Sequence, residues 1–205
     1  MKYWIVSDTH FSHAMLVNAG LRPKNCDELM VKHWINQVKP DDTVIHLGDA
    51  AWPNAWENDV FNKLPGRKVL VMGNHDKKSA RWYSEHGFDF VCNMFVLKYG
   101  GFDMVFTHKP WINHPFDVNI HGHYHNNFNQ EYYKDHPELY CISMEVLNYQ
   151  PLSMDRLVKD LQSNFARKKK AKQGEKYDVV EPEVKEDTER YVRKFSERFE
   201  DLSEH

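Results

Sequence analysis

The residues of this chain that could carry chemistry gather in five short polar blocks, each of which ends or follows an apolar run. Their side chains include three aspartates, one asparagine and several histidines. Oxygen and imidazole ligands of this kind suit divalent cations near the borderline between hard and soft. The blocks are, in chain order, Asp8-Thr9-His10, Gly48-Asp49, Gly73-Asn74-His75-Asp76, Thr107-His108 and His121-Gly122-His123-Tyr124-His125.

The spacing within the blocks favours a site for two cations. Asp8 and His10 are two residues apart, so an extended backbone directs both side chains to one side, where they can chelate an ion. Gly48 allows a tight turn that pushes the carboxylate of Asp49 forward. A single carboxylate at a strand end can bridge two ions, which lie roughly 3.5–4 Å apart in two-metal hydrolases. We therefore expect two divalent metal ions, with Mn²⁺, Fe, Zn²⁺, Co²⁺ and Ni²⁺ as candidates.

Hydrophobic periodicity predicts the elements that bring these blocks together. The first half alternates apolar strands with amphipathic helices, which is typical of α/β layering, and the second half is mostly strands. Gly100-Gly101 marks a hairpin turn, and residues 126–137 look like a loop beside the site. The expected strands are 2–7, 43–47, 68–72, 90–99, 102–107, 118–121 and 139–144, and the expected helices are 27–38, 56–64, 77–86 and 153–161.

Composition limits the classes of protein to consider. The 205 residues are 41% hydrophobic, which suffices for one folded domain. A net charge of −3 gives no general basic field, so nucleic acid is a possible partner that charge does not indicate. Three cysteines without a CxxC pair suit a reducing compartment. Neither a signal-peptide pattern nor an apolar run of roughly 18 residues is present, so we expect a cytoplasmic protein that does not enter membranes.

The composition changes near residue 164. Residues 165–205 contain 11 basic and 11 acidic side chains, and residues 184–202 have the pattern of an amphipathic helix. We therefore divide the chain into a folded domain over residues 1–163 and a charged C-terminal extension over residues 164–205. Docking of the extension's helix on its own domain is favoured over a nucleic-acid arm, and a dimer through its apolar face is a third option.

In the order of its polar blocks, the chain resembles the calcineurin-like metallophosphoesterases, in particular their small single-domain bacterial and phage members. That family's pattern runs D-x-H, GD, GNH(D/E), (G/T)H and GHxH, and each part has a counterpart here. The resemblance covers roughly residues 2–160, so residues 1–163 would be the catalytic domain. It implies an α/β fold, a four-layer αββα sandwich of two mixed sheets flanked by helices, with the active site at the strand ends.

The resemblance also implies a role for each matching residue. His75 would contact the scissile phosphate and help the leaving group depart, and Asp76 would orient His75 or tune its pKa. His121 precedes the GHxH part and would be structural. Seven residues would bind metal: Asp8, His10 and His125 on one ion, Asn74, His108 and His123 on the other, and Asp49 as the bridge.

The reaction implied is hydrolysis of a phosphoester. Two cations sharing a water would lower its pKa enough to give hydroxide, which attacks phosphorus in line. A phosphodiester is favoured, because the extended GDxxDRG and GNHE motifs of phosphoprotein phosphatases are replaced here by GDAAWPN and GNHD. The expected substrate is a small phosphoester, and the candidates for contacting it are His13, Lys109 and Trp111.

Two alternatives to a phosphodiesterase remain. One is a phosphomonoesterase, since the missing motifs weaken only the phosphoprotein interpretation. The other is a non-catalytic protein-binding scaffold on the same fold. A scaffold predicts lost ligands or a missing catalytic histidine, whereas His75 and every ligand position are filled here.

Overall fold

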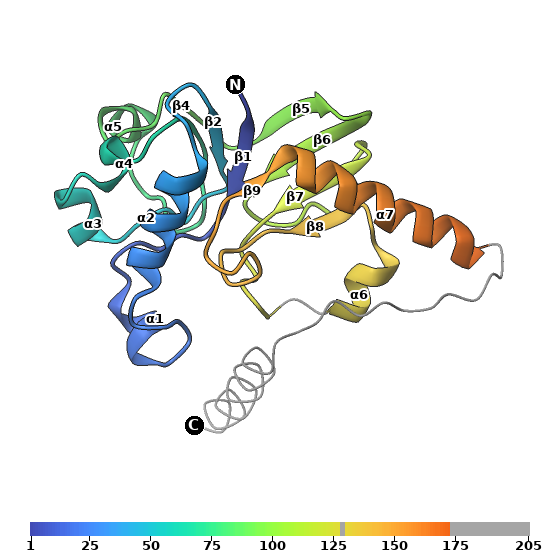
Figure 1. Ribbon diagram of the computed structural model, residues 1–205, viewed down its shortest axis with the longest axis horizontal. Coiled ribbons are helices and arrows are strands. Elements are labelled where there is room, and N and C mark those ends of the chain that lie inside the picture. Colours follow the sequence, from blue (N-terminus) through green and yellow to red (C-terminus); the bar gives the residue numbers. More distant parts are fainter. Residues whose placement is uncertain (128–129, 173–205) are drawn as a thin grey trace.

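The computed structural model describes residues 1–127 and 130–172, which form two β-sheets with helices around them (Figure 1). The strands are β1 (Tyr3–Val6), β2 (Thr43–His46), β3 (Arg67–Val71), β4 (Phe90–Cys92), β5 (Phe95–Tyr99), β6 (Phe102–Thr107), β7 (Val118–His121), β8 (Leu139–Cys141) and β9 (Leu152–Ser153). The helices are α1 (Ala14–Asn18), α2 (Cys26–Gln37), α3 (Pro53–Glu57), α4 (Val60–Lys63), α5 (Ala80–Glu85), α6 (Gln130–Asp135) and α7 (Met154–Lys172).

The first sheet has the strand order β4-β3-β2-β1-β9. Strands β1 to β4 pair in parallel, and β9 pairs antiparallel with β1. Because β1, β2 and β3 point the same way, their carboxyl ends meet at one edge of the sheet. The residues that follow these three strands therefore lie side by side.

The second sheet has the order β5-β6-β7-β8. Strands β5 and β6 form the expected antiparallel hairpin, with Tyr99 opposite Phe102 around Gly100-Gly101. Strands β6, β7 and β8 are parallel, so their carboxyl ends also share an edge. Each sheet thus mixes parallel and antiparallel pairs, and the prediction of an α/β fold with two mixed sheets and flanking helices is confirmed.

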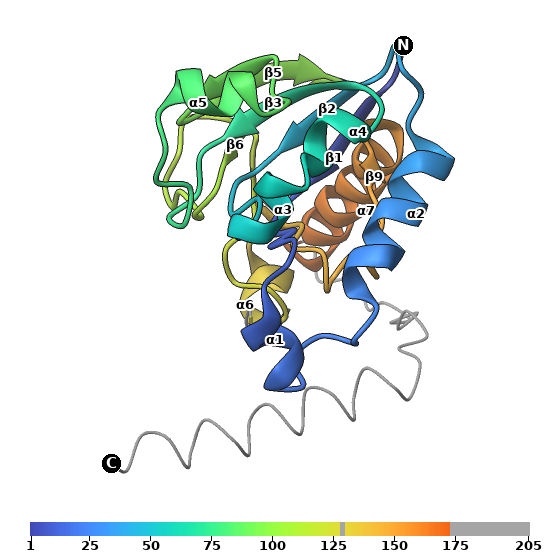
Figure 2. The same ribbon diagram turned by 90° about the vertical axis from the view of Figure 1, so that its left-hand side faces the viewer.

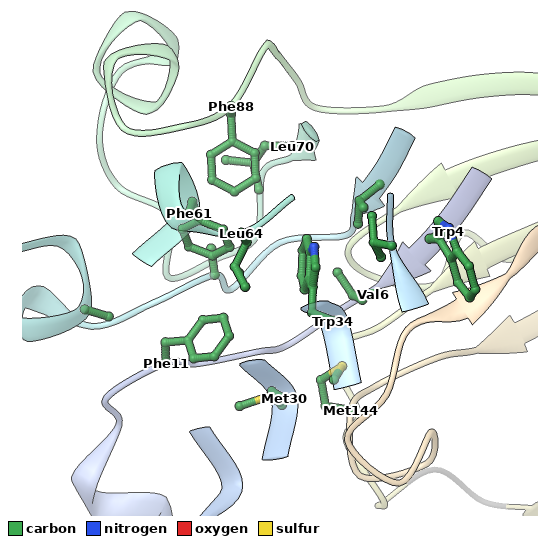
Figure 3. Close-up of a cluster of buried hydrophobic side chains, with 14 of the residues drawn as sticks. Trp4, Val6, Phe11, Met30, Trp34, Phe61, Leu64, Leu70, Phe88 and Met144 are labelled. Carbon is green, nitrogen blue, oxygen red and sulfur yellow. The ribbon is translucent and has the colours of Figure 1, made fainter. Parts of the chain in front are cut away.

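Two apolar clusters hold these layers together. The first packs Trp34 of α2 and Phe61 of α4 against the first sheet through Val44 and Leu70 (Figure 3). Figure 2 shows α4 in front of the strands of the first sheet and α2 to its right. The second cluster lies between the sheets and includes Ile5, Ile45, Met104 and Phe106, with Leu157 and Leu161 of α7 closing it. Neighbouring residues such as Val44 and Ile45 belong to different clusters because successive strand side chains point to opposite faces.

Three expected elements are divided or change type in the structure. The helix expected over 56–64 is two short helices, α3 and α4, because Asp59 between them has a left-handed φ of 54°. The strand expected over 90–99 is split into β4 and β5, which belong to different sheets. The loop expected over 126–137 contains α6.

Helix α7 begins as expected and continues beyond the expected end. The hydroxyl of Ser153 accepts a hydrogen bond from the Arg156 amide at 3.3 Å, which caps the start of the helix. The helix runs to Lys172, and Phe165 packs against Phe102, so it crosses the boundary expected at 163/164. In the part of the chain that the structure describes, no helix is both long and apolar enough to cross a membrane. The helix expected over 184–202 lies outside the described residues.

Candidate metal centre

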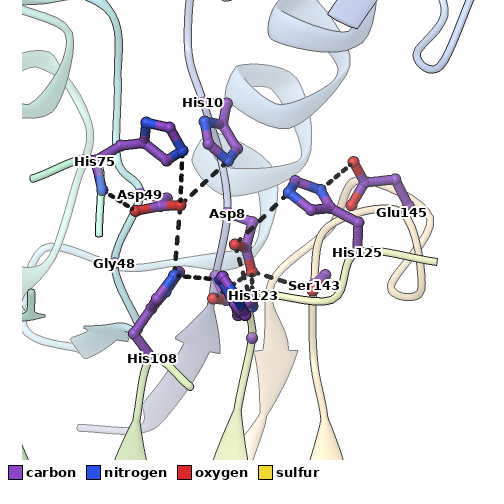
Figure 4. Close-up of polar contacts among 12 residues, drawn as sticks. Asp8, His10, Gly48, Asp49, His75, His108, His123, His125, Ser143 and Glu145 are labelled. Carbon is purple, nitrogen blue, oxygen red and sulfur yellow. Dashed lines mark hydrogen bonds and ion pairs between the residues drawn. The ribbon is translucent and has the colours of Figure 1, made fainter. Parts of the chain in front are cut away.

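The polar blocks converge where the carboxyl edges of the two sheets meet (Figure 4). The first sheet contributes the residues that follow β1, β2 and β3, and the second sheet contributes those that follow β6 and β7. All seven expected ligands belong to these turns: Asp8, His10, Asp49, Asn74, His108, His123 and His125.

The first ligand group consists of Asp8, His10 and His125, whose ligand atoms lie within 4.8 Å of one another. Asp8 is fully buried, and its Oδ2 accepts hydrogen bonds from the hydroxyls of Ser7 at 2.6 Å and Ser143 at 3.1 Å. Both ring nitrogens of His10 are buried without a hydrogen-bond partner among the described residues. Since buried polar atoms are normally paired, this imidazole fits a metal ligand.

The second ligand group consists of Asp49, His108 and His123, with ligand atoms again within 4.8 Å of one another. The His108 Nε2 lies 2.9 Å from Oδ1 of Asn74 and 3.2 Å from Nδ1 of His123. The opposite nitrogen of His108, Nδ1, bonds to the carbonyl of Leu47 at 2.8 Å. That bond orients the ring, so that Nε2 lies beside Oδ1 of Asn74 and Nδ1 of His123.

Asp49 lies between the two groups. Its Oδ2 is 3.6 Å from Nε2 of His10 and 3.4 Å from Nε2 of His108, one imidazole from each group. Its Oδ1 accepts the amide hydrogen of His75 at 2.8 Å. The carboxylate is therefore held by the His75 turn while one oxygen faces both groups.

The backbone at the centre is strained. Five of the expected ligands adopt the left-handed φ that L-residues avoid: Asp8 (54°), His10 (45°), Asp49 (54°), His123 (72°) and His125 (52°). Such conformations cost of order 1–3 kcal/mol each and persist where the surrounding structure enforces them, which is typical of functional sites.

Close backbone contact enforces part of this geometry. At Gly48, which has a φ of 88°, a Cβ would collide with the backbone of Gly73, so the two turns pack back to back. At Gly122 a Cβ would collide with the hydroxyl of Ser7 and the carboxylate of Asp8. The glycines of the motifs are therefore needed for the turns to meet.

The electrostatics of the centre favour cation binding. Burial lowers the pKa of His10 to about 2 and, together with the charge of His108, lowers that of His123 to about 4. These imidazoles are thus neutral, the form that binds metal. Burial raises the pKa of Asp8, whereas for Asp49 the hydrogen bond and charge of His108 outweigh burial and lower the pKa. Divalent cations would stabilise both carboxylates as anions, so the donor set fits them.

His75 and Asp76 lie in the expected turn, but the side chain of His75 is exposed whereas that of Asp76 is buried. The side chain of His75 is 49% exposed and its Nε2 lies 3.9 Å from Oδ2 of Asp49. The carboxylate of Asp76 is buried and accepts the amide hydrogens of Asp49 at 2.8 Å, Ala50 at 3.2 Å and Gly73 at 2.8 Å. Asp76 therefore holds the two turns together, and among the described residues no hydrogen bond joins it to His75.

The three residues expected to contact substrate differ in how near they lie to the expected metal ligands. His13 stacks on Trp52 with ring centroids 3.7 Å apart, and Trp52 lies 5.4 Å from His10 and 5.1 Å from His75, so this pair borders the ligands. Lys109 is exposed beside His108. The ring of Trp111 instead packs on Phe116, and no described contact joins it to a ligand.

Two buried charged residues that the sequence analysis did not single out lie against the first ligand group. Glu145 accepts a hydrogen bond from Nδ1 of His125 at 2.9 Å, and Arg22 pairs with Glu145 at 2.6 Å. His121, expected to be structural, is fully buried and bonds to the Tyr133 hydroxyl at 2.9 Å. No spacing relates Arg22 or Glu145 to the motifs, so the sequence carries no signal for them.

Two groups of oxygen and imidazole side chains border the carboxylate of Asp49 at the facing edges of the two sheets, and each group could hold a metal ion, an arrangement that fits a metal-dependent hydrolase. The calcineurin-like phosphoesterase family matches residues 1–186, and the chain belongs to that family. The protein is therefore a metal-dependent phosphoesterase, as the resemblance in the motifs implied.

Two of the following three similar proteins match 77% of this chain, and the third matches a shorter part. The uncharacterized protein MJ1445 of Methanocaldococcus jannaschii is 32% identical over 170 residues, covering 77% of this chain and 90% of its own. The Gene 66 protein of Mycobacterium phage L5 is 34% identical over 84 residues, which is 36% of this chain and 39% of its own length. The crystal structure of AQ665, a protein of unknown function from Aquifex aeolicus, superposes with a TM-score of 0.64 at 29% identity, covering 77% of this chain and 98% of that chain.

Proposed function

We propose that this protein hydrolyses phosphodiesters at a centre of two divalent cations. The observation that carries the proposal is the place of Asp49, whose Oδ2 lies 3.6 Å from His10 and 3.4 Å from His108 and so borders both ligand groups. When bound, a pair of cations lowers the pKa of a shared water and neutralises the phosphate oxygens. The ligands would be Asp8, His10 and His125 for one ion, Asn74, His108 and His123 for the other, and Asp49 for both.

His75 is the residue best placed to act on the leaving group. Its amide is fixed by Asp49 at 2.8 Å while its imidazole is 49% exposed beside the ligands. A phosphoester held at the centre would meet this ring from the solvent side. His75 would donate a hydrogen bond or a proton to the departing oxygen, a contribution worth typically 10²–10⁴-fold in rate.

The charges around the centre support a diester over a monoester. A diester carries one negative charge and a monoester up to two, and guanidinium groups are the usual partners of the extra charge. Arg22 lies beneath the first ligand group, but its donors are engaged by Asp8, Thr9 and Glu145. Lys109 is the exposed cation beside His108. We expect a small phosphoester as partner and the cytoplasm as location, where the three free cysteines would remain reduced.

The test compares bis(p-nitrophenyl) phosphate with p-nitrophenyl phosphate and measures bound metal in the same preparations. We expect wild type loaded with Mn²⁺ to hold two ions per chain, to prefer the diester, and to lose activity on chelation. His75→Ala should keep both ions and lose about 10²-fold or more in kcat. Asp49→Ala should lose metal as well as activity, because one carboxylate serves both ligand groups.

The matched control is His136→Ala, since His136 bonds to Glu138 away from the centre and its side chain is 37% exposed. This variant should behave as wild type. Equal turnover by His75→Ala and wild type would remove His75 from the mechanism. Two firmly bound ions in Asp49→Ala would contradict the shared carboxylate.

A further inference from the structure

Arg22 and Glu145 form a buried ion pair directly behind the first ligand group. Arg22 lies between α1 and α2, Glu145 follows β8, and 123 residues separate them. The Arg22 Nε donates to Oε1 of Glu145 at 2.7 Å, and the Arg22 Nη2 lies 2.6 Å from the same oxygen. Their side chains are 1% and 8% exposed.

Each member of the pair also holds one part of the ligand group. Arg22 donates to the backbone carbonyls of Asp8 and Thr9, both at 2.6 Å, and so supports the turn in which Asp8 and His10 take left-handed φ. Glu145 binds Nδ1 of His125 at 2.9 Å (Figure 4). One ion pair therefore connects the ligands supplied by the first sheet with the ligand supplied by the second.

The contact with His125 also selects its tautomer. A carboxylate accepts hydrogen bonds and cannot donate one when ionised, so Nδ1 must carry the hydrogen and Nε2 is left free. That Nε2 faces Asp8, with 3.9 Å between it and Oδ1. A carboxylate behind a ligating imidazole fixes its orientation and raises its basicity.

A gain in folding stability does not by itself explain why the chain has this buried ion pair. A buried ion pair loses solvation and often contributes no more stability than apolar side chains of similar volume. The second ligand group is built differently, because the corresponding bond of His108 goes to the neutral carbonyl of Leu47. Moreover, Oε2 of Glu145 is buried with no described hydrogen-bond partner. The pair is thus specific to one half of the centre.

We propose that Arg22 and Glu145 are positioning residues that give the first ligand group, formed by Asp8, His10 and His125, its affinity for a cation. The inference rests on the proposed function, since it concerns the same centre. Loss of either residue should therefore weaken cation binding at the first ligand group and leave cation binding at the second ligand group unchanged.

The test measures Mn²⁺ binding to metal-free protein by calorimetry, with the free energy of unfolding of each metal-free variant measured in urea. Wild type should bind two ions. In Glu145→Gln one of the two affinities should fall by about 10–100-fold while the other stays within twofold. The double variant Arg22→Met/Glu145→Leu should recover part of the stability lost in Arg22→Met, because no unpaired charge stays buried, although the carbonyls of Asp8 and Thr9 still lack their donor. It should still lack the affinity.

The matched control is Arg156→Met, which removes an exposed pair with Asp160 and should bind both ions as wild type does. Unchanged affinities in Glu145→Gln, or recovery of affinity together with stability in the double variant, would overturn the proposal. A wild type that binds two ions and hydrolyses no phosphodiester would refute the proposed function while leaving this assignment intact.

Discussion

Asp49 and Asp76 show how two similar carboxylates in glycine-led turns take different roles. Asp49 directs one oxygen at imidazoles of both ligand groups, 3.4 and 3.6 Å away. Asp76 accepts three backbone amides, from Asp49, Ala50 and Gly73, and burial raises its pKa despite those bonds. In the structure Asp76 therefore anchors two turns, and its expected action on His75 stays a prediction.

Removing that anchor should destabilise the fold. In Asp76→Ala three buried amides lose their acceptor, and an unsatisfied buried donor costs about 1–3 kcal/mol. We expect the free energy of unfolding of metal-free protein in urea to fall by about 3 kcal/mol, with metal binding weakened because Asp49 moves. Asp41→Ala, at an exposed position, is the control. If Asp76 acted mainly on His75, activity would fall while stability stayed at the wild-type value.

At the scale of the elements, the last residue of β2 supports two turns at once. The Nε2 of fully buried His46 bonds to the hydroxyl of Thr9 at 2.8 Å, and that hydroxyl donates to the carbonyl of Ala50 at 2.6 Å. The Nδ1 of His46 accepts the Gly48 amide at 3.1 Å. The ring must therefore be neutral, with its hydrogen on Nε2. Burial, the largest cause, lowers its pKa to about 3.

This histidine should make stability depend on pH. Its pKa is about 3 in the folded state and 6.5 in the unfolded chain, so below pH 6.5 the unfolded state binds the extra proton. Stability from this group is complete above pH 6.5 and declines as pH falls toward 3, by up to about 1.4 kcal/mol per pH unit. Urea unfolding of metal-free protein between pH 7.5 and 5 should show a shallower slope in His46→Gln. An unchanged slope would mean that His46 titrates normally.

Strand ends were more predictable from the sequence than helix breaks. An apolar run that stops at Asp8, Asp49 or Asn74 identifies a buried strand and its exit residue, because period and polarity change together. The split between α3 and α4 depends on the left-handed φ of Asp59, which residue type does not determine. The pattern also did not reveal α6, since Gln130–Asp135 is polar and reads as a loop.

At the scale of the whole molecule, the positions of the seven expected ligands were predictable, and the contacts that support them were not. Motif order fixes which residues reach the shared edge, and the structure brings all seven together. The support joins segments far apart in sequence, as Arg22 and Glu145 do across 123 residues, through contacts that leave no periodic trace. Close contacts between turns, such as that of Gly48 with Gly73, likewise join segments that are separate in the sequence.

The contact of Gly122 with Ser7 and Asp8 is where the second sheet's turn meets the first sheet, so the centre should be sensitive to a single methyl group there. A Cβ at Gly122 would overlap the Ser7 hydroxyl and the Asp8 carboxylate. Gly122→Ala should displace Asp8 or His123, whose amide donates to Asp8 at 3.0 Å, and lower both Mn²⁺ affinity and kcat at least about tenfold. Gly101→Ala, with a φ of 86° and open space around it, should lose some stability and keep both values. If Gly122→Ala bound Mn²⁺ as wild type does, the two halves of the centre would not depend on this contact.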